Sequence, residues 1–135
     1  MSQSPLPFKF DVTALGVSQG PFNTKIDYSY HCAGDWGKAS TIVVAGQATP
    51  ETLKSIADKL FDSAGFLPKQ LGIDSLAPDS DSDEYDDGLD HPVHHFVGFT
   101  LTTEAPTVLL TFEQIVNVFI GLKSDNDWDF GKFGL

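Results

Sequence analysis

The sequence predicts an α+β fold, in which an antiparallel sheet of four to five strands carries two helices on one face. Three observations support this: apolar residues that alternate in the first third of the chain, and one apolar stripe of helical spacing after each of Thr49 and Thr111. Alternation with a period of two indicates half-buried strands, whereas spacings of three and four indicate amphipathic helices. At 135 residues the chain has the length of one domain, so we expect residues 1–135 to fold as a unit.

Residues 8–17, 25–32 and 40–45 have the composition of strands in an antiparallel meander. Turn-forming clusters separate them at residues 18–23 and 33–38, so the first two strands are expected to form a hairpin. The residues expected on the inner face of these two strands are Phe8, Phe10, Val12, Ala14, Ile26, Tyr28 and Tyr30.

The first helix is expected to span residues 50–64. Thr49 suits its N-cap, Pro50 suits its first position, and Gly65 is expected to end it in a left-handed conformation. Its apolar stripe consists of Leu53, Ile56, Ala57, Leu60, Phe61 and Ala64.

The later part of the chain predicts a strand at residues 93–102, a short edge strand at 107–110, and a second helix that ends near 121–123. Thr111 and Gln114 have the spacing of a capping box at the start of that helix. The inner face of the strand is expected to hold Val93, His95, Val97, Phe99 and Leu101, with His95 as a core histidine. The helical stripe consists of Phe112, Ile115, Val116 and Phe119.

The charge of the chain limits its choice of partners. The net charge is −11, and all eight basic residues are lysines. Phosphate recognition favours the forked guanidinium of arginine, so we expect no direct binding of nucleic acid. A protein this acidic is attracted to basic surfaces, including those with which other proteins hold nucleic acid.

An acidic loop is expected at residues 74–91, which hold eight carboxylates and no lysine. It is interpreted either as a solvated loop without a single role or as a patch that docks on a basic partner. A third interpretation is a calcium loop at 79–90, whose ligand positions would be occupied by Asp79, Asp81, Asp83, Tyr85, Asp87 and Asp90. Against calcium, Glu84 stands where the turn needs glycine, and Pro78 and Pro92 flank the loop where helices should be.

Asp90, His91, His94 and His95 are candidate ligands for zinc or nickel. In a strand His94 and His95 point to opposite faces, so they would need a bulge to converge on one ion. We therefore expect no cofactor, and divalent metal binding remains an alternative.

No catalytic motif is found. His31 and Cys32 are neighbours on an expected strand and face opposite ways, so they cannot act as a dyad on one atom. The chain contains no Gly-rich phosphate loop, no Gly-x-Ser-x-Gly and no His-Glu-x-x-His. We expect a protein that is not an enzyme, and the single cysteine together with the lack of a long apolar run predicts a cytoplasmic location.

The tail at residues 124–135 combines acidic and aromatic residues. Trp128, Phe130 and Phe133 lie among three aspartates, an arrangement that suits the anchors of an interface. Alternatively, the tail folds back and its rings complete the core of the domain.

Four stretches, at residues 66–76, 90–94, 105–107 and 111–114, resemble a loose group of small acidic proteins from bacterial plasmids and phage-like elements. In that group a Phe-x-Pro-x-Gln-x-Gly segment follows a helix, and an Asp-His-x-x-His segment follows an acidic loop. The group has no established activity, so the resemblance implies no site residues. It implies a mobile element as the context, where small acidic proteins commonly block host defences as anti-CRISPR or anti-restriction inhibitors, some of them by imitating the charge of DNA.

The leading hypothesis is a non-catalytic acidic protein that inhibits a basic partner that handles nucleic acid. The alternatives are an immunity protein against a nuclease toxin and a metal-binding protein. The residues expected to contact the partner are Asp79, Asp81, Asp83, Glu84, Asp86, Asp87, Asp127, Trp128, Asp129 and Phe130.

Overall fold

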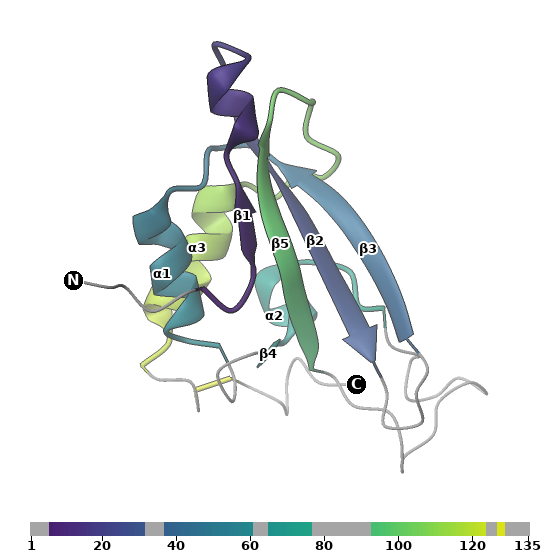
Figure 1. Cartoon of the computed structure of the whole chain (residues 1–135). Helices are drawn as coiled ribbons and strands as arrows, with labels where there is room; N and C mark the ends of the chain where they lie inside the picture. Colours follow the sequence, from purple (N-terminus) through teal and green to yellow (C-terminus); the bar gives the residue numbers. More distant parts are fainter. Residues whose placement is uncertain (1–5, 32–36, 61–64, 77–92, 124–126, 129–135) are drawn as a thin grey trace.

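The computed structural model describes residues 6–31, 37–60, 65–76, 93–123 and 127–128. They form an α+β fold in which helices cover one face of a mixed, mostly antiparallel sheet of five strands (Figure 1). The strands are β1 (Lys9–Asp11), β2 (Asn23–His31), β3 (Gly37–Val44), β4 (Gly65–Phe66) and β5 (His94–Thr102). The helices are the 3-10 helix η1 (Thr13–Gly16) and the α-helices α1 (Pro50–Ala57), α2 (Pro68–Leu71) and α3 (Phe112–Gly121). No helix in these ranges is long and apolar enough to cross a membrane.

The strands lie in the order β1-β5-β2-β3, and β4 pairs with the start of β5. The predicted hairpin between residues 8–17 and 25–32 is wrong, because β1 pairs in parallel with β5, which separates it from β2 in the sheet. The first strand is also short. The carboxylate of Asp11 accepts the backbone N–H of Thr13 at 2.8 Å, and this local turn leads the chain from the strand into η1.

A bulge in β5 decides which of its side chains are buried. Gly98 pairs with Asp27 and Phe96 pairs with Tyr28, so Val97 is an extra residue between the two pairs. The bulge shifts the alternation by one residue. The buried side chains of β5 are therefore those of His94, Phe96, Phe99 and Leu101, whereas Val97 is 48% exposed. The prediction that His95 is the core histidine is wrong, since that histidine is His94.

The starts of both long helices agree with their predicted signals. Thr49 caps α1 in a capping box with Thr52, and Thr111 caps α3 in a capping box with Gln114. The predicted end of the first helix is wrong. Helix α1 ends at Ala57, and Gly65 lies in β4 instead of forming the cap.

The predicted strand at 107–110 is also wrong, although this segment does border the sheet. Thr107 exchanges two hydrogen bonds with Val43 of β3, one through its backbone N–H and one through its hydroxyl, both of 2.9 Å. Thr111 then pairs with Ala45. The segment therefore covers the end of the β3 edge without continuing as a strand.

The core lies between the helices and the inner face of the sheet, and aromatic rings fill much of it. Phe66 and Phe96 stack with their centroids 4.0 Å apart, and Phe96 also contacts Phe99 and Phe119. The predicted inner residues Ile26, Tyr28 and Tyr30 are fully buried. The short helix α2 also buries Pro68 and Leu71 beside this core.

Candidate interaction surface

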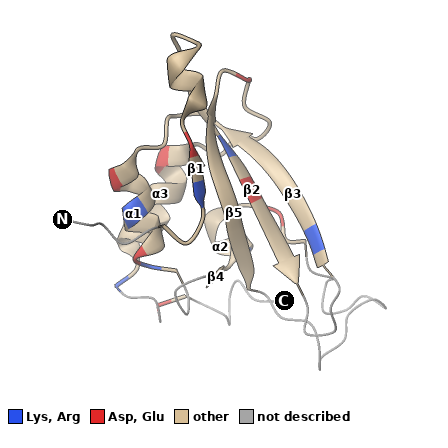
Figure 2. Cartoon of the chain, in the orientation of Figure 1, with Lys and Arg blue, Asp and Glu red and all other residues tan. Residues whose placement is uncertain are grey.

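The described part of the chain is almost neutral. It holds eight carboxylates and seven lysines, a net charge of −1, and Figure 2 shows them scattered over the helices and the sheet. The carboxylates are those of Asp11, Asp27, Glu51, Asp58, Asp74, Glu104, Glu113 and Asp127. Of the total charge of −11, the remaining −10 therefore belongs to residues outside the described ranges.

Most of this remaining charge is connected to one end of the sheet, which we call the lower end. His31 pairs with Gly37, and Gly65 pairs with His95, so the end of β2 and the starts of β3, β4 and β5 meet there (Figure 1). Residues 32–36 link His31 to Gly37, and residues 77–92 precede β5. These two segments contain eight carboxylates and no lysine. Strand pairing thus brings the described residues that flank these two acidic segments to the same end of the sheet.

The residues just before the segment 77–92 are fastened to the core. The backbone N–H of Leu76 donates to Nε2 of His94 at 2.9 Å, and the carbonyl of Asp74 accepts the hydroxyl of Tyr28 at 2.9 Å. His94 is fully buried, and its ring packs against the rings of Tyr30 and Phe66. The segment therefore follows Leu76, which is bonded to the buried His94, and it is followed by Val93 and the start of β5.

The stability that Tyr28 contributes should depend on pH in the alkaline range, because burial raises the pKa of its hydroxyl above the ordinary value of about 10. The unfolded chain then loses this proton at lower pH than the folded chain, so the free energy of unfolding should fall as pH rises through about 10. We expect Tyr28→Phe to lower the free energy of unfolding at pH 8 by about 1 kcal/mol relative to the wild type, because the carbonyl of Asp74 loses its hydrogen-bond donor. Urea unfolding of both proteins between pH 8 and pH 11 measures this difference. This deficit should shrink towards pH 11. A deficit that stays constant with pH would contradict the prediction.

His94 and His95 do not converge on one ion. Nε2 of the buried His94 accepts the Leu76 N–H, and His95 lies on the opposite face of β5. Among the described residues, no group of three histidine, cysteine, aspartate or glutamate side chains could hold a metal. The other two candidate ligands, Asp90 and His91, and the calcium loop predicted at 79–90 lie outside the described residues.

The tail places Trp128 inside the domain. Its side chain is 5% exposed, and its Nε1 donates to the carbonyl of Lys59 at 2.8 Å. Its ring packs edge-on against the ring of Phe119, with the two centroids 5.3 Å apart. The burial of Trp128 agrees with the alternative in which the tail completes the core, and it argues against an exposed anchor at this residue. Asp127 is exposed and accepts the backbone N–H of Lys123 at 3.0 Å. Asp129 and Phe130 lie outside the described residues.

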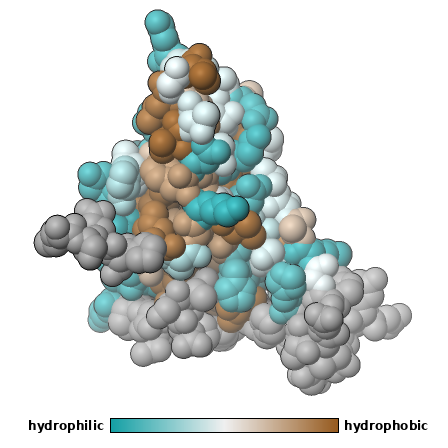
Figure 3. Space-filling model, viewed as in Figure 1, coloured by the Kyte–Doolittle hydropathy of each residue, from teal (hydrophilic) through white to brown (hydrophobic). Residues whose placement is uncertain are grey.

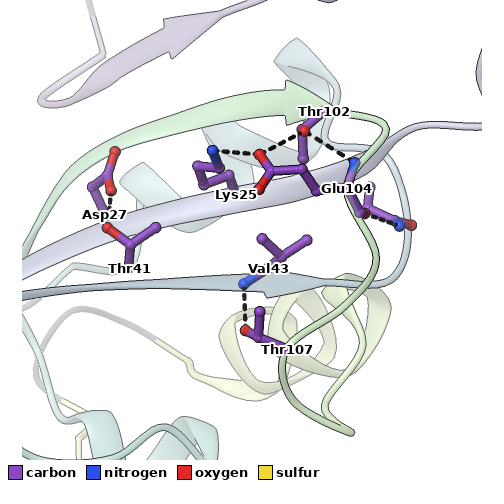
Figure 4. Close-up of polar contacts among 8 residues, drawn as sticks. Lys25, Asp27, Thr41, Val43, Thr102, Glu104 and Thr107 are labelled. Atoms are coloured by element: carbon purple, nitrogen blue, oxygen red, sulfur yellow. Dashed lines mark hydrogen bonds and ion pairs between the residues drawn. The ribbon is translucent and has the colours of Figure 1, made fainter.

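The open face of the sheet satisfies its own charges. Figure 4 shows Lys25 paired with Glu104, and Asp27 accepting the hydroxyl of Thr41. The Lys25 ammonium, followed by the hydroxyl of Thr102, lowers the pKa of the Glu104 carboxyl. Lys25 and Glu104 neutralise each other, whereas Asp27 keeps its negative charge and is stabilised by the hydroxyl of Thr41.

An apolar tip stands at the opposite, upper end of the molecule. Val12, Leu15 and Val17 on and beside η1 are 43%, 48% and 79% exposed, and Figure 3 shows apolar surface there. The tip is remote from the lower end, where the two acidic segments join the sheet.

Comparisons with protein-family models, with curated proteins and with solved structures give no match. The six loop residues expected to bind a partner, Asp79, Asp81, Asp83, Glu84, Asp86 and Asp87, all lie in the segment 77–92, outside the described residues.

Proposed function

We propose that the protein is a non-catalytic acidic binding protein that occupies the basic, nucleic-acid-binding surface of a target protein and so inhibits it. An anti-CRISPR or anti-restriction inhibitor that imitates the charge of DNA is the form of this function that we favour. The supporting observation is the division of charge, with a scaffold of net charge −1 and eight carboxylates in the two segments that join its lower end.

The mechanism is electrostatic and steric competition. Carboxylates concentrated in these two segments attract a basic surface over a distance that salt limits to about 10 Å at 0.1 M. Once docked, the folded scaffold blocks the surface to nucleic acid. The complementary charges set the rate of association and the choice of partner, so affinity should fall steeply with ionic strength. Such a target lies in the cytoplasm, where we place the protein.

The first test is affinity capture from the lysate of the native host at low and at high salt. We expect one basic protein that handles nucleic acid to be recovered at low salt and lost at high salt. If the recovered protein is a nuclease toxin, the alternative of an immunity protein is favoured. Recovery of nothing, or of salt-resistant partners alone, would contradict the electrostatic mechanism.

Neutralising the segment 77–92 tests the same mechanism with the recovered target. Changing Asp79, Asp81, Asp83, Asp86 and Asp87 to asparagine and Glu84 to glutamine should weaken binding at least tenfold at low salt, because each charge adds to the attraction. The measurement is calorimetric titration at two salt concentrations.

A matched pair of variants controls for total charge. Asp81→Asn with Asp83→Asn removes two charges from the segment, and Glu51→Gln with Glu113→Gln removes two from the helices. We expect the first pair to weaken binding more than the second. Equal effects would show that only the net charge matters, and unchanged binding in the six-residue variant would reject the proposed function.

A further inference from the structure

His94 is a buried histidine whose ring accepts a hydrogen bond from the backbone. It is fully buried on β5, and its Nε2 accepts the N–H of Leu76 at 2.9 Å. A ring nitrogen that accepts a hydrogen bond carries no proton, so the ring is neutral while this bond is made. The imidazole of histidine ordinarily has a pKa of about 6.5, so mild acid is enough to protonate such a ring once water reaches it.

The bond to Leu76 and protonation of the ring exclude each other. In the imidazolium both nitrogens carry protons, so Nε2 of His94 would point an N–H at the N–H of Leu76. The two donors repel each other, and the N–H of Leu76 loses its acceptor. This conflict arises at Nε2 alone, so it holds whatever contact the other ring nitrogen makes.

The described groups around the ring keep a constant charge in mild acid. The ring packs against β2 and β4 and bonds the chain at Leu76, and the titratable groups on these parts are the hydroxyls of Tyr28 and Tyr30 and the exposed carboxyl of Asp74. Beyond Tyr30, the exposed Lys38 of β3 lies on the same face of the sheet. Tyrosine, aspartate and lysine side chains ordinarily titrate well outside the range from pH 5.5 to 7.5, whereas histidine titrates within it.

The chain before Leu76 is attached at two further points. The N–H of Ile73 donates to the carbonyl of Pro68 at 2.9 Å, and the Ile73 side chain is 5% exposed. The carbonyl of Asp74 accepts the hydroxyl of Tyr28 at 2.9 Å. Neither bond involves the histidine ring, so both should remain when the bond to Leu76 is lost.

From this arrangement we propose that His94 is a pH-sensitive switch for the attachment of Leu76 to the sheet. At neutral pH the neutral ring holds the N–H of Leu76, and in mild acid the ring takes up a proton and releases it. Because the ring binds a proton more readily once the bond is open, the bond is fully stable above about pH 6.5 and weakens as the pH falls below this value. In acid the chain would then be held to the sheet through Asp74, two residues earlier. The proposal does not depend on the proposed function.

Amide hydrogen exchange of the full chain, followed by NMR between pH 7.5 and pH 5.5, tests the proposal. Each exchange rate is divided by the intrinsic rate at the same pH to give a protection factor. For a ring that titrates at about pH 6.5 when the bond is open, the protection factor of the Leu76 amide should fall about tenfold over this range. The Ile73 amide is the internal control, and its protection factor should change by less than about twofold.

Two results of this experiment would overturn the proposal. One is a protection factor at Leu76 that does not change with pH. The other is an equal fall at Leu76 and Ile73, because acid would then open the whole domain instead of this one attachment. The nitrogen chemical shifts of the His94 ring at pH 7.5 are a second measurement on the wild type. We expect Nε2 to be the unprotonated nitrogen, and a proton on Nε2 would overturn the proposal.

A pair of variants separates the two neighbouring histidines. His94→Gln removes the titrating ring and keeps a carbonyl oxygen that can accept the N–H of Leu76, so protection there should vary by less than about twofold between pH 7.5 and pH 5.5. His95→Gln changes the histidine on the other face and should keep the tenfold fall. A fall that persists in His94→Gln or disappears in His95→Gln would overturn the proposal. If His94→Gln does not fold, the ring nitrogen shifts of the wild type decide.

Discussion

Replacing His94 with alanine should lower the free energy of unfolding by about 3–5 kcal/mol. The ring is fully buried against Tyr30 and Phe66, so its removal leaves a cavity, and the N–H of Leu76 loses its acceptor. Urea unfolding followed by circular dichroism measures the change. The segment 77–92 should also lose its fixed start, so proteolysis within it should become faster.

Two controls isolate the causes of this loss. His94→Leu keeps most of the volume and removes the acceptor, so it should cost about 1–3 kcal/mol. His95→Ala changes the neighbouring, half-buried histidine on the other face and should cost about 1 kcal/mol or less. Equal losses at His94 and His95 would contradict the placement of the bulge in β5.

Replacing Trp128 with alanine should cost about 3–5 kcal/mol, because a large ring leaves the contact with Phe119 and the carbonyl of Lys59 loses its donor. A partner-binding tryptophan would show the opposite pattern, with little effect on stability and a large effect on affinity. Chemical unfolding of the variant, measured beside its affinity for the captured target, distinguishes the two roles.

Trp128→Phe is the matched control, since it keeps an aromatic ring and removes the Nε1 donor. It should cost about 1–2 kcal/mol. Val17→Ala removes apolar atoms from a side chain that is 79% exposed, and it should change stability by less than about 0.5 kcal/mol. If Trp128→Ala left the free energy of unfolding unchanged, the hypothesis that the tail binds a partner would be favoured.

Local signals predicted the long elements well. Thr49 and Thr111 cap their helices, and the described residues of both apolar stripes pack in or against the core, because capping and helical periodicity depend on residues only three or four apart. Phe61 and Ala64 of the first stripe lie outside the described residues. The α+β class and the placement of helices on one face followed from these same patterns (Figure 1).

The errors arose where distant residues decide the structure. Strand β1 pairs with β5 instead of β2, and the bulge at Val97 buries His94 in place of His95. Neither the pairing of β1 nor the bulge can be predicted from the alternation of apolar residues within one strand, because each depends on which strand lies alongside. Likewise, Trp128 is buried by Phe119 and by the carbonyl of Lys59, which lie elsewhere in the chain.

The sequence by itself determined the amount of charge on this protein, its concentration in residues 74–91, and the helices and strands whose patterns are local. Only the tertiary structure decided that the acidic segments join a nearly neutral scaffold at one end of the sheet. Composition is a property of the chain alone. The meeting of separate segments arises from pairing between residues far apart in sequence, which packing of the whole core selects.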